Sequence, residues 1–203
     1  EKFGEAYALF VAALDEAQLA QAGPIHNGRF AVPTTRNFFD WRIGNQKGLN
    51  TTLTKVPRED SPVLDTALEM RFLNSPVKVN TIWQNLSLAA GNYELSADYL
   101  SQRLRAPKDI GIVIKCLPGY APIAELPLPA SDTKRLQSSI RFRVADENCP
   151  IQRVGLETEF LATTWRNRFQ GMMRLYEVSI KPMPGEEIRQ QTTAGPDNWE
   201  VAN

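Results

Sequence analysis

Trp83 stands among polar and charged side chains that are better suited to holding a ligand than to building a core. A sugar needs such a set, because its C–H face lies on an aromatic ring while carboxylate, amide and guanidinium groups hold its hydroxyls. The sequence therefore predicts a polysaccharide or oligosaccharide ligand. The candidate binding face consists of outward residues on predicted strands: Trp83, Asp98, Arg141, Arg143 and Glu157.

The usual signatures of catalysis are missing from the sequence. His26 is the only histidine, so sites that need two imidazoles, including His-rich zinc sites, are excluded. No nucleophile elbow, phosphate-binding loop, dinucleotide fingerprint or EF-hand spacing occurs. A glycosidase needs two carboxylates across a cleft, which Asp98, Glu157 or Glu159 could supply. A carbohydrate-active enzyme is therefore a minority hypothesis.

Short alternating segments fill the middle of the chain and predict an all-β protein. The clearest, residues 82–97, reads as two strands joined at Ala-Gly-Asn, which favours a hairpin with one buried face. Four prolines make Leu117–Ala130 a connection rather than a central strand. We expect a jelly-roll β-sandwich of about eight antiparallel strands. The strand candidates are Asn50–Val56, Ala67–Leu73, Thr81–Leu88, Tyr93–Leu104, Ile110–Leu117, Gln137–Val144, Ile151–Thr158 and Gln170–Lys181.

Period-two parity decides which side chains face the core, because successive residues of a strand point to opposite faces. Ile82, Leu86 and Leu88 form an apolar series, which leaves Trp83 on the outer face. The same argument places the remaining candidates of the binding face outward, together with Arg153. The residues predicted to point inward are Tyr93, Leu95, Ala97, Ile112, Ile114, Ile140, Phe142, Val144, Val154 and Leu156.

The chain divides into three parts. Residues 1–22 are predicted to form an amphipathic helix, closed by Gly23-Pro24, that either ends an upstream helical domain or packs on the sandwich. Residues 27–181 form the jelly roll, and residues 182–203 form a polar C-terminal arm. Because the chain begins at Glu1 without Met or a leader, we expect a piece of a larger protein.

Charge and cysteine content narrow the classes of partner. With 23 Lys+Arg against 23 Asp+Glu the net charge is +0, which argues against a nucleic-acid partner. No apolar stretch reaches membrane-spanning length.

Cys116 and Cys149 would permit one disulfide in an oxidising compartment, although two buried thiols explain them equally well. We expect a periplasmic, extracellular or cell-envelope location.

Three motifs in register resemble the galactose-binding-domain-like jelly rolls, which include carbohydrate-binding modules of the xylan- and glucan-binding type. Asn27-Gly28-Arg29-Phe30, followed by Phe39-Asp40-Trp41-Arg42-Ile43, is similar to that family's opening motif. The segment Trp83–Ala97 is similar to its central motif, and Arg174–Ile180 looks like its closing strand. The resemblance spans roughly residues 27–181. It implies a jelly-roll fold, carbohydrate binding and a structural role for Trp41.

The resemblance also directs attention to other aromatic and acidic residues. With Trp41 in the core, Trp83 and Tyr99 remain as ring platforms, and Trp165, in a polar stretch, is a candidate at the loop tips. Members commonly hold a structural calcium through acidic residues after the opening Asn-Gly and in the last strand. Of these acidic positions, this sequence keeps mainly Glu177. One carboxylate supplies too few oxygen ligands for calcium, so no cofactor is predicted.

The leading hypothesis is a non-catalytic carbohydrate-binding domain of a larger exported or envelope-associated protein. The second is a protein-interaction or assembly domain that keeps the sandwich without the sugar site. Its docking elements would be the N-terminal helix, facing an upstream helical repeat domain, and the C-terminal arm. The third is the carbohydrate-active enzyme.

Overall fold

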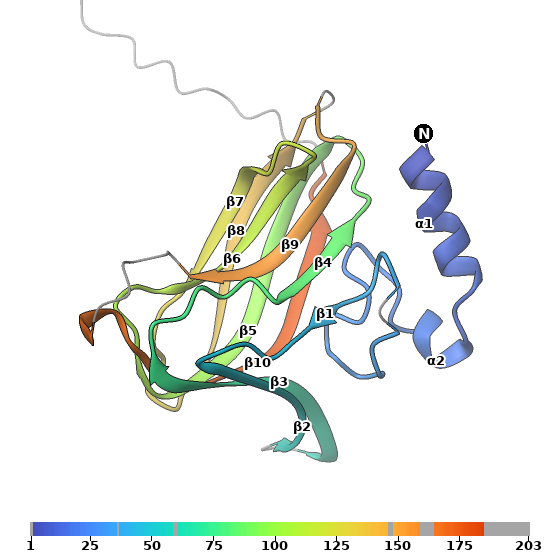
Figure 1. The fold of residues 1–203 in the computed structure, drawn as a ribbon. Coiled ribbons are helices and arrows are strands. Elements are labelled where there is room, and N and C mark those ends of the chain that lie inside the picture. The colour runs from blue at the N-terminus through green and yellow to red at the C-terminus, as the bar shows by residue number, and fades with distance from the viewer. Residues whose placement is uncertain (1, 36, 59–60, 146–147, 159–164, 185–203) are drawn as a thin grey trace, which may run out of the picture.

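The computed structural model describes residues 2–35, 37–58, 61–145, 148–158 and 165–184. In this part of the chain, ten strands form two antiparallel five-stranded sheets that pack as a sandwich, which confirms the predicted fold class (Figure 1). The elements are α1 (Lys2–Ala12), α2 (Glu16–Leu19), β1 (Arg42–Ile43), β2 (Leu49–Arg58), β3 (Ser61–Ser75), β4 (Ile82–Leu86), β5 (Gly91–Arg105), β6 (Ile110–Leu117), β7 (Ala121–Leu128), β8 (Arg135–Val144), β9 (Ile151–Thr158), the 3₁₀ turn η1 (Trp165–Asn167) and β10 (Phe169–Pro182).

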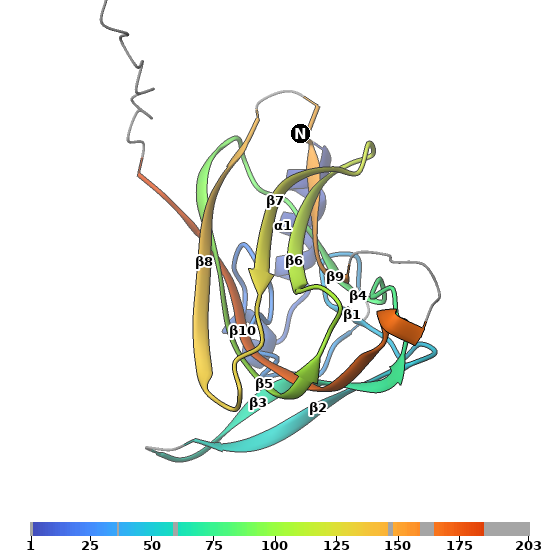
Figure 2. The same cartoon turned by 90° about the vertical axis from the view of Figure 1, so that its left-hand side faces the viewer.

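The two sheets have simple strand orders. Sheet A runs β1-β4-β9-β6-β7, and sheet B runs β2-β3-β10-β5-β8. Figure 2 shows the layers from the side, with β8 in one and β6 and β7 in the other. The core lies between them, because alternate side chains of each strand point inward. Nearly all residues predicted to point inward are buried there, with Ile140 only partly buried.

The predicted hairpin over residues 82–97 is wrong, because its two strands belong to different sheets. β4 pairs with β1 and β9, whereas β5 pairs with β10 and β8. The link between them crosses from sheet A to sheet B. Gln152 holds it by accepting a hydrogen bond from the backbone N–H of Leu88 at 2.9 Å, and the Tyr93 hydroxyl donates to the carbonyl of Ala89 at 2.8 Å. These two side chains thus hold the backbone at residues 88 and 89 in a crossover, where a hairpin would have a tight turn.

Two strands were not predicted from sequence. One is the two-residue β1, and the other is β7, which lies within the segment interpreted as a connection. β7 is the last strand of sheet A and pairs only with β6. An edge strand tolerates Pro122 and Pro127 because only one of its sides must supply ladder donors. The prolines therefore exclude a central strand, as predicted, without excluding a strand.

The N-terminal segment forms two helices rather than the single predicted helix. α1 ends at Ala12, and Asp15 starts α2 as its N-cap, with extended backbone angles. The Asp15 carboxylate accepts from the backbone N–H of Gln18 at 2.8 Å, and the Gln18 side chain accepts in return from Asp15 N–H at 3.3 Å. This reciprocal capping box satisfies donors at the start of α2 and redirects the chain. No helix in the described ranges is long and apolar enough to cross a membrane.

Cys116 and Cys149 form a disulfide, which decides between the two interpretations that the sequence left equally open. It joins β6 to the segment that leads into β9.

The opening motif packs against the last strand: Val178 N–H donates to the Gly28 carbonyl at 2.9 Å. Trp41 is 1% exposed beside Phe30, as the resemblance implied. Of the predicted C-terminal arm, only the residues up to 184 are described.

Candidate functional site

A groove crosses the outer face of sheet A from β4 over β9 and β6 to β7. It consists of two hollows, of about 270 Å³ and about 650 Å³, that share three lining residues and therefore lie side by side. The shared residues are Lys115, Tyr120 and Glu157. The smaller hollow lies over β4 and β9, and the larger lies over β6 and β7. Outward-facing side chains of neighbouring strands thus form one continuous surface.

Arg153 of β9 lies against the aromatic ring of Trp83 on β4, with its guanidinium carbon 3.8 Å from the ring centroid. Its Nε donates to Oδ1 of Asn85 at 3.0 Å, and the Tyr120 ring lies 5.7 Å from the same guanidinium carbon. The guanidinium is attracted to both π-faces, and the hydrogen bond fixes its orientation. One face of the Trp83 ring is therefore covered by a cation, as the sequence did not predict.

Lys115 and Glu157 form an ion pair where the two hollows meet. Lys115 Nζ lies 2.6 Å from Oε1 and 2.7 Å from Oε2 of Glu157. Next to this pair, Gly111 and Gly155 place no side chain on the floor of the groove. A Cβ at Gly155 would lie 3.1 Å from the Ile82 carbonyl oxygen, whereas one at Gly111 would meet nothing closer than 3.6 Å. At Gly155, β4 thus packs closely against β9.

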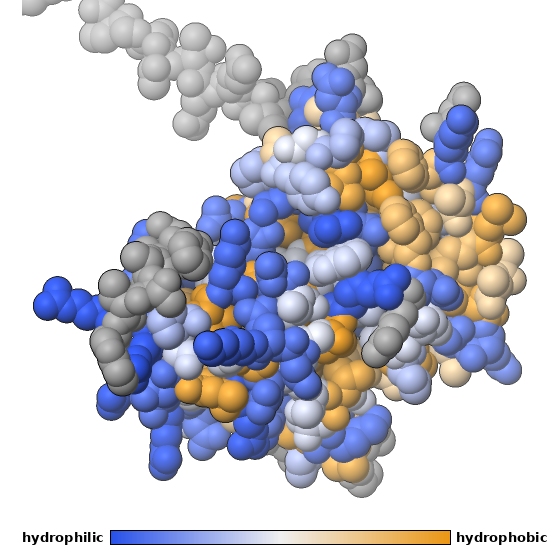
Figure 3. All heavy atoms as spheres, in the orientation of Figure 1, coloured by the Kyte–Doolittle hydropathy of each residue, from blue (hydrophilic) through white to orange (hydrophobic). Residues whose placement is uncertain are grey.

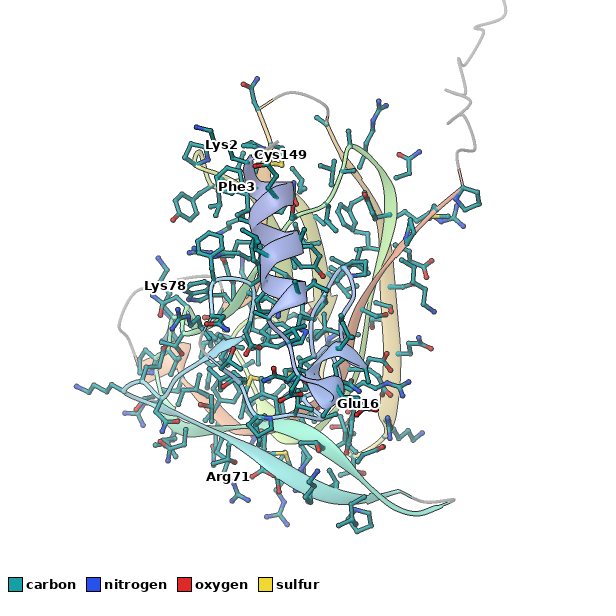
Figure 4. The ribbon with its side chains drawn as sticks, turned by 90° about the vertical axis from the view of Figure 1, so that its right-hand side faces the viewer. Lys2, Phe3, Glu16, Arg71, Lys78 and Cys149 are labelled. Carbon is teal, nitrogen blue, oxygen red and sulfur yellow. A yellow bond between two sulfur atoms is a disulfide. The ribbon has the colours of Figure 1, made fainter. Side chains whose placement is uncertain are left out.

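Helix α1 packs on another part of the outer face of sheet A. Leu117 and Ile151 point outward near the other ends of β6 and β9, and they form a second apolar cluster with Phe10 of α1 and Phe39. The Tyr7 hydroxyl donates to the carbonyl of Gly23 at 2.6 Å. Figure 4 shows α1 lying along this side of the sandwich. No residue of this cluster lines either hollow, so α1 and the groove occupy different parts of the outer face.

The predicted binding face is divided between the two sheets, which corrects the sequence interpretation. Trp83 and Glu157 lie in the groove, whereas Asp98, Arg141 and Arg143 lie on the outer face of sheet B. Both sets point outward, as parity predicted, but from opposite sides of the sandwich. The split follows from the missed crossover between β4 and β5, which sends the two halves of the supposed hairpin to different sheets.

On sheet B, Asp98 is part of an ion-pair network. Arg135 donates from Nε to Oδ1 of Asp98 at 2.8 Å and from Nη1 to Asp65 at 3.2 Å. Its guanidinium carbon also lies 4.0 Å from the Tyr176 ring centroid. The hydrogen bond to Asp98 is the main reason that the pKa of Arg135 is raised, and burial opposes it. Asp98 on β5 therefore holds Arg135 on the neighbouring strand β8. Arg141 and Arg143 are exposed beside it, opposite Glu94 and Asn92 in the register of β5.

Tyr99 and Trp165 were also predicted to offer an aromatic ring to the sugar, and the described part of the structure shows neither ring in such a position. Tyr99 is 0% exposed in the core, so the expectation that its ring meets a ligand is wrong. The parity that placed Ala97 inward already places Tyr99 inward. Trp165 begins η1, but its side chain lies outside the described residues, so its role at a loop tip stays a prediction.

Glu177, the calcium candidate, lies beside a cation of the protein itself. Arg29 Nε is 3.1 Å from Oε2 of Glu177. Among the described residues, no three His, Cys, Asp or Glu side chains gather in a way that could hold a metal ion.

Tyr120 is one of three groove residues, with Lys115 and Arg153, that the predicted binding face left out. It is 54% exposed and follows Pro118-Gly119 in the turn between β6 and β7. An exposed aromatic after a Pro-Gly turn was the available signal, but it lay in a segment interpreted as a plain connection. Arg153 was placed outward by parity without being included in the candidate face.

The fold of this chain is that of carbohydrate-binding modules. A family 4 carbohydrate-binding module aligns with 78% of the chain and 99% of its own length, with a TM-score of 0.52 and 13% identity. A putative sugar-binding protein from Bacteroides thetaiotaomicron aligns with 80% of the chain and all of its own length, at a TM-score of 0.53 and 12% identity. A family 61 module in complex with β-1,4-galactotriose gives 0.50 and 17%, over 80% of this chain and 99% of the module.

Parts of larger proteins share the fold as well. The chain spans 26% of an α-L-arabinofuranosidase and 21% of an enzymatically active bacteriophage tailspike fragment. No family model and no curated protein matches the sequence.

Proposed function

We propose that this chain is a non-catalytic carbohydrate-binding domain and that it binds an oligosaccharide or polysaccharide in the groove of sheet A. The observation that carries the proposal is the groove itself, in which Trp83 and Tyr120 lie beside Arg153, Lys115 and Glu157. The likeness to carbohydrate-binding modules supports it through the fold.

The groove offers the two kinds of contact that sugars use. The Tyr120 ring and the part of Trp83 not covered by Arg153 provide apolar surface for the C–H face of a pyranose. The Lys115–Glu157 pair provides both donors and acceptors for hydroxyl groups. Because the two hollows are adjacent, several sugar units could lie across the strands.

The test is affinity electrophoresis of the 203-residue protein in gels containing plant, bacterial or host polysaccharides. For a retarding polysaccharide, Tyr120→Ala and Trp83→Ala should each weaken binding by roughly 10-fold, since aromatic anchors dominate such sites. Phe3→Ala, which removes an exposed ring on α1, is the matched control and should bind as the unchanged protein does. Full affinity in a folded Tyr120→Ala, Trp83→Ala double variant would show that the ligand binds elsewhere.

We further propose that the domain belongs to a larger protein of the periplasm, the cell envelope or the extracellular space. The disulfide between Cys116 and Cys149 supports an oxidising compartment. The test is to lyse the cells that naturally make the protein directly into denaturant and alkylating reagent, and to count the modified cysteines. Two modified thiols per chain would contradict this location, and none is expected.

A carbohydrate-active enzyme has less support. Asp98 and Glu157 lie on the outer faces of different sheets and cannot flank one glycosidic bond, and Glu159 lies outside the described residues. Glu157 also accepts a hydrogen bond from Lys115, so its carboxylate already has a cationic partner. Release of reducing sugar from a bound polysaccharide, lost in a Glu157→Gln variant, would overturn the non-catalytic proposal.

A second candidate function, protein docking, is favoured by helix α1. Its outer side exposes Phe3 and Leu9, the latter 72% exposed, and Figure 3 shows the resulting apolar surface at the right. A helix that is apolar on both sides usually packs on both. The partner we name is a helical domain of the parent protein. Amide hydrogen exchange of residues 2–12 should then be slower in the parent protein than in the 203-residue chain, and equal rates would exclude this partner.

A further inference from the structure

We propose that the groove selects a glycan with anionic substituents, carboxylate or sulfate, and that Arg153 is the residue that binds them. This inference rests on the proposed function, because it names the class of sugar that the same groove would take. It is carried by the way in which the Arg153 side chain is held and by the charges around it.

Arg153 is the cation at the centre of the smaller hollow. The side chains that line this hollow include three basic residues, Lys78, Lys115 and Arg153, and one acidic residue, Glu157. Glu157 is bound to Lys115. No carboxylate forms an ion pair with Arg153 in the described part of the chain. Because Lys115 is paired with Glu157, the positive charge that this hollow offers a ligand rests on Arg153.

The guanidinium is held in a fixed orientation before any ligand binds. Asn85 Oδ1 accepts from Nε, which leaves the two Nη groups as the donors for a ligand. The Trp83 ring at 3.8 Å and the Tyr120 ring at 5.7 Å restrict the plane of the guanidinium from its sides. Asn85 is itself held, because its Nδ2 donates to the Phe38 carbonyl at 3.1 Å.

An anion on a sugar satisfies this arrangement better than a hydroxyl does. A planar guanidinium with both Nη groups available matches the two oxygens of a carboxylate or sulfate, and charge-assisted bonds are about twice as strong as neutral ones. Because the side chain is already oriented, little rotamer entropy is lost when the anion binds. The neighbouring rings lie where the pyranose that bears the anion would contact them.

The experiment compares matched ligands by isothermal titration calorimetry. The first pair is oligogalacturonate and its fully methyl-esterified form, which differ in charge but share a backbone. The second pair is a sulfated galactan oligosaccharide and its desulfated form, which distinguishes sulfate from carboxylate. At least one anionic member should bind roughly 10-fold or more tightly than its neutral counterpart, and added NaCl should weaken only the anionic member.

Variants assign the effect to Arg153. Arg153→Gln should remove most of the preference for the anionic ligand, and Arg153→Lys, which keeps the charge but not the paired donors, should retain part of it. Arg141→Gln is the matched control, because Arg141 is an exposed arginine on sheet B. Its preference should equal that of the unchanged protein. Circular dichroism of each variant verifies the fold.

The two proposals fail in different ways. If each neutral ligand binds as tightly as its anionic counterpart, the groove binds sugar but the inference about anions is wrong. The same holds if a folded Arg153→Gln variant keeps the full preference. If neither of these ligand pairs nor any polysaccharide of the panel binds, the proposed function fails and the inference fails with it.

Discussion

The ring of Phe10 on helix α1 meets the imidazole of His26 edge to face, with 5.2 Å between their centroids. His26 is 2% exposed, and burial lowers its pKa, while the nearby Asp40 carboxylate acts in the opposite direction. Burial thus favours the neutral form of the imidazole that packs against α1.

We predict that stability falls as the pH drops below about 6.5, the ordinary pKa of histidine. Above that pH, His26 is neutral in the folded and the unfolded chain and does not make the free energy of unfolding depend on pH. Below it, the unfolded chain binds a proton that the folded protein does not, so the free energy of unfolding from His26 falls by up to about 1.4 kcal/mol per pH unit until the folded pKa is reached. Urea denaturation between pH 7.5 and pH 5 measures this slope.

The control for the pH prediction is His26→Asn, which removes the titrating ring. The bond from Gln84 to residue 26 uses the backbone carbonyl, so the substitution preserves it. Carboxylates contribute their own pH dependence to both proteins, and only the difference between the two curves reports His26. Parallel curves over this range would contradict the prediction.

Removing the disulfide should destabilise the fold without changing its topology. Cys116 and Cys149 are 33 residues apart, and a cross-link closing a loop of this size contributes roughly 2–4 kcal/mol by restricting the unfolded chain. A double variant, Cys116→Ser with Cys149→Ser, should lose about this free energy of unfolding in denaturant titrations. Reductant should weaken the unchanged protein similarly and leave the double variant unaffected. A double variant as stable as the oxidised protein would argue against this contribution.

Gly28→Ala should be strongly destabilising. A Cβ at this position would lie 2.2 Å from the backbone carbonyl oxygen of Val178, and backbone cannot rotate away as a side chain can. We expect a loss of about 2 kcal/mol or more in the free energy of unfolding, because the opening motif must move off β10. Gly4→Ala is the matched control. Its Cβ meets nothing within 4 Å, and in α1 it should stabilise by up to about 1 kcal/mol.

Asp98→Asn should leave carbohydrate binding unchanged, because Asp98 lies on sheet B, away from the groove. It should lower stability by at most about 1 kcal/mol, since the pair with Arg135 is partly exposed and Arg135 keeps Asp65. Affinity electrophoresis and thermal unfolding measure the two effects separately. A large loss of affinity in a stable Asp98→Asn protein would place the ligand on sheet B.

Much of the fold was predictable from local pattern. The bounds of β6 and β9 agree with their predicted ranges, and those of the other predicted strands differ mainly at their ends. What pattern alone could not supply was β7, because prolines that exclude a central strand are tolerated at an edge. The break between α1 and α2 was likewise missed, although Asp15 and Gln18 carry the signal of a capping box.

For the candidate site, the sequence by itself determined which way each side chain points. Trp83, Arg153, Glu157 and Asp98 all face outward, since the alternation within a strand is a local property of the backbone. Only the tertiary structure decided which of them share a surface. Strand pairing depends on contacts between residues far apart in the chain, and here β4 and β5 pair in different sheets. That pairing separates Asp98 from Trp83 and brings Arg153 and Tyr120 to the tryptophan instead.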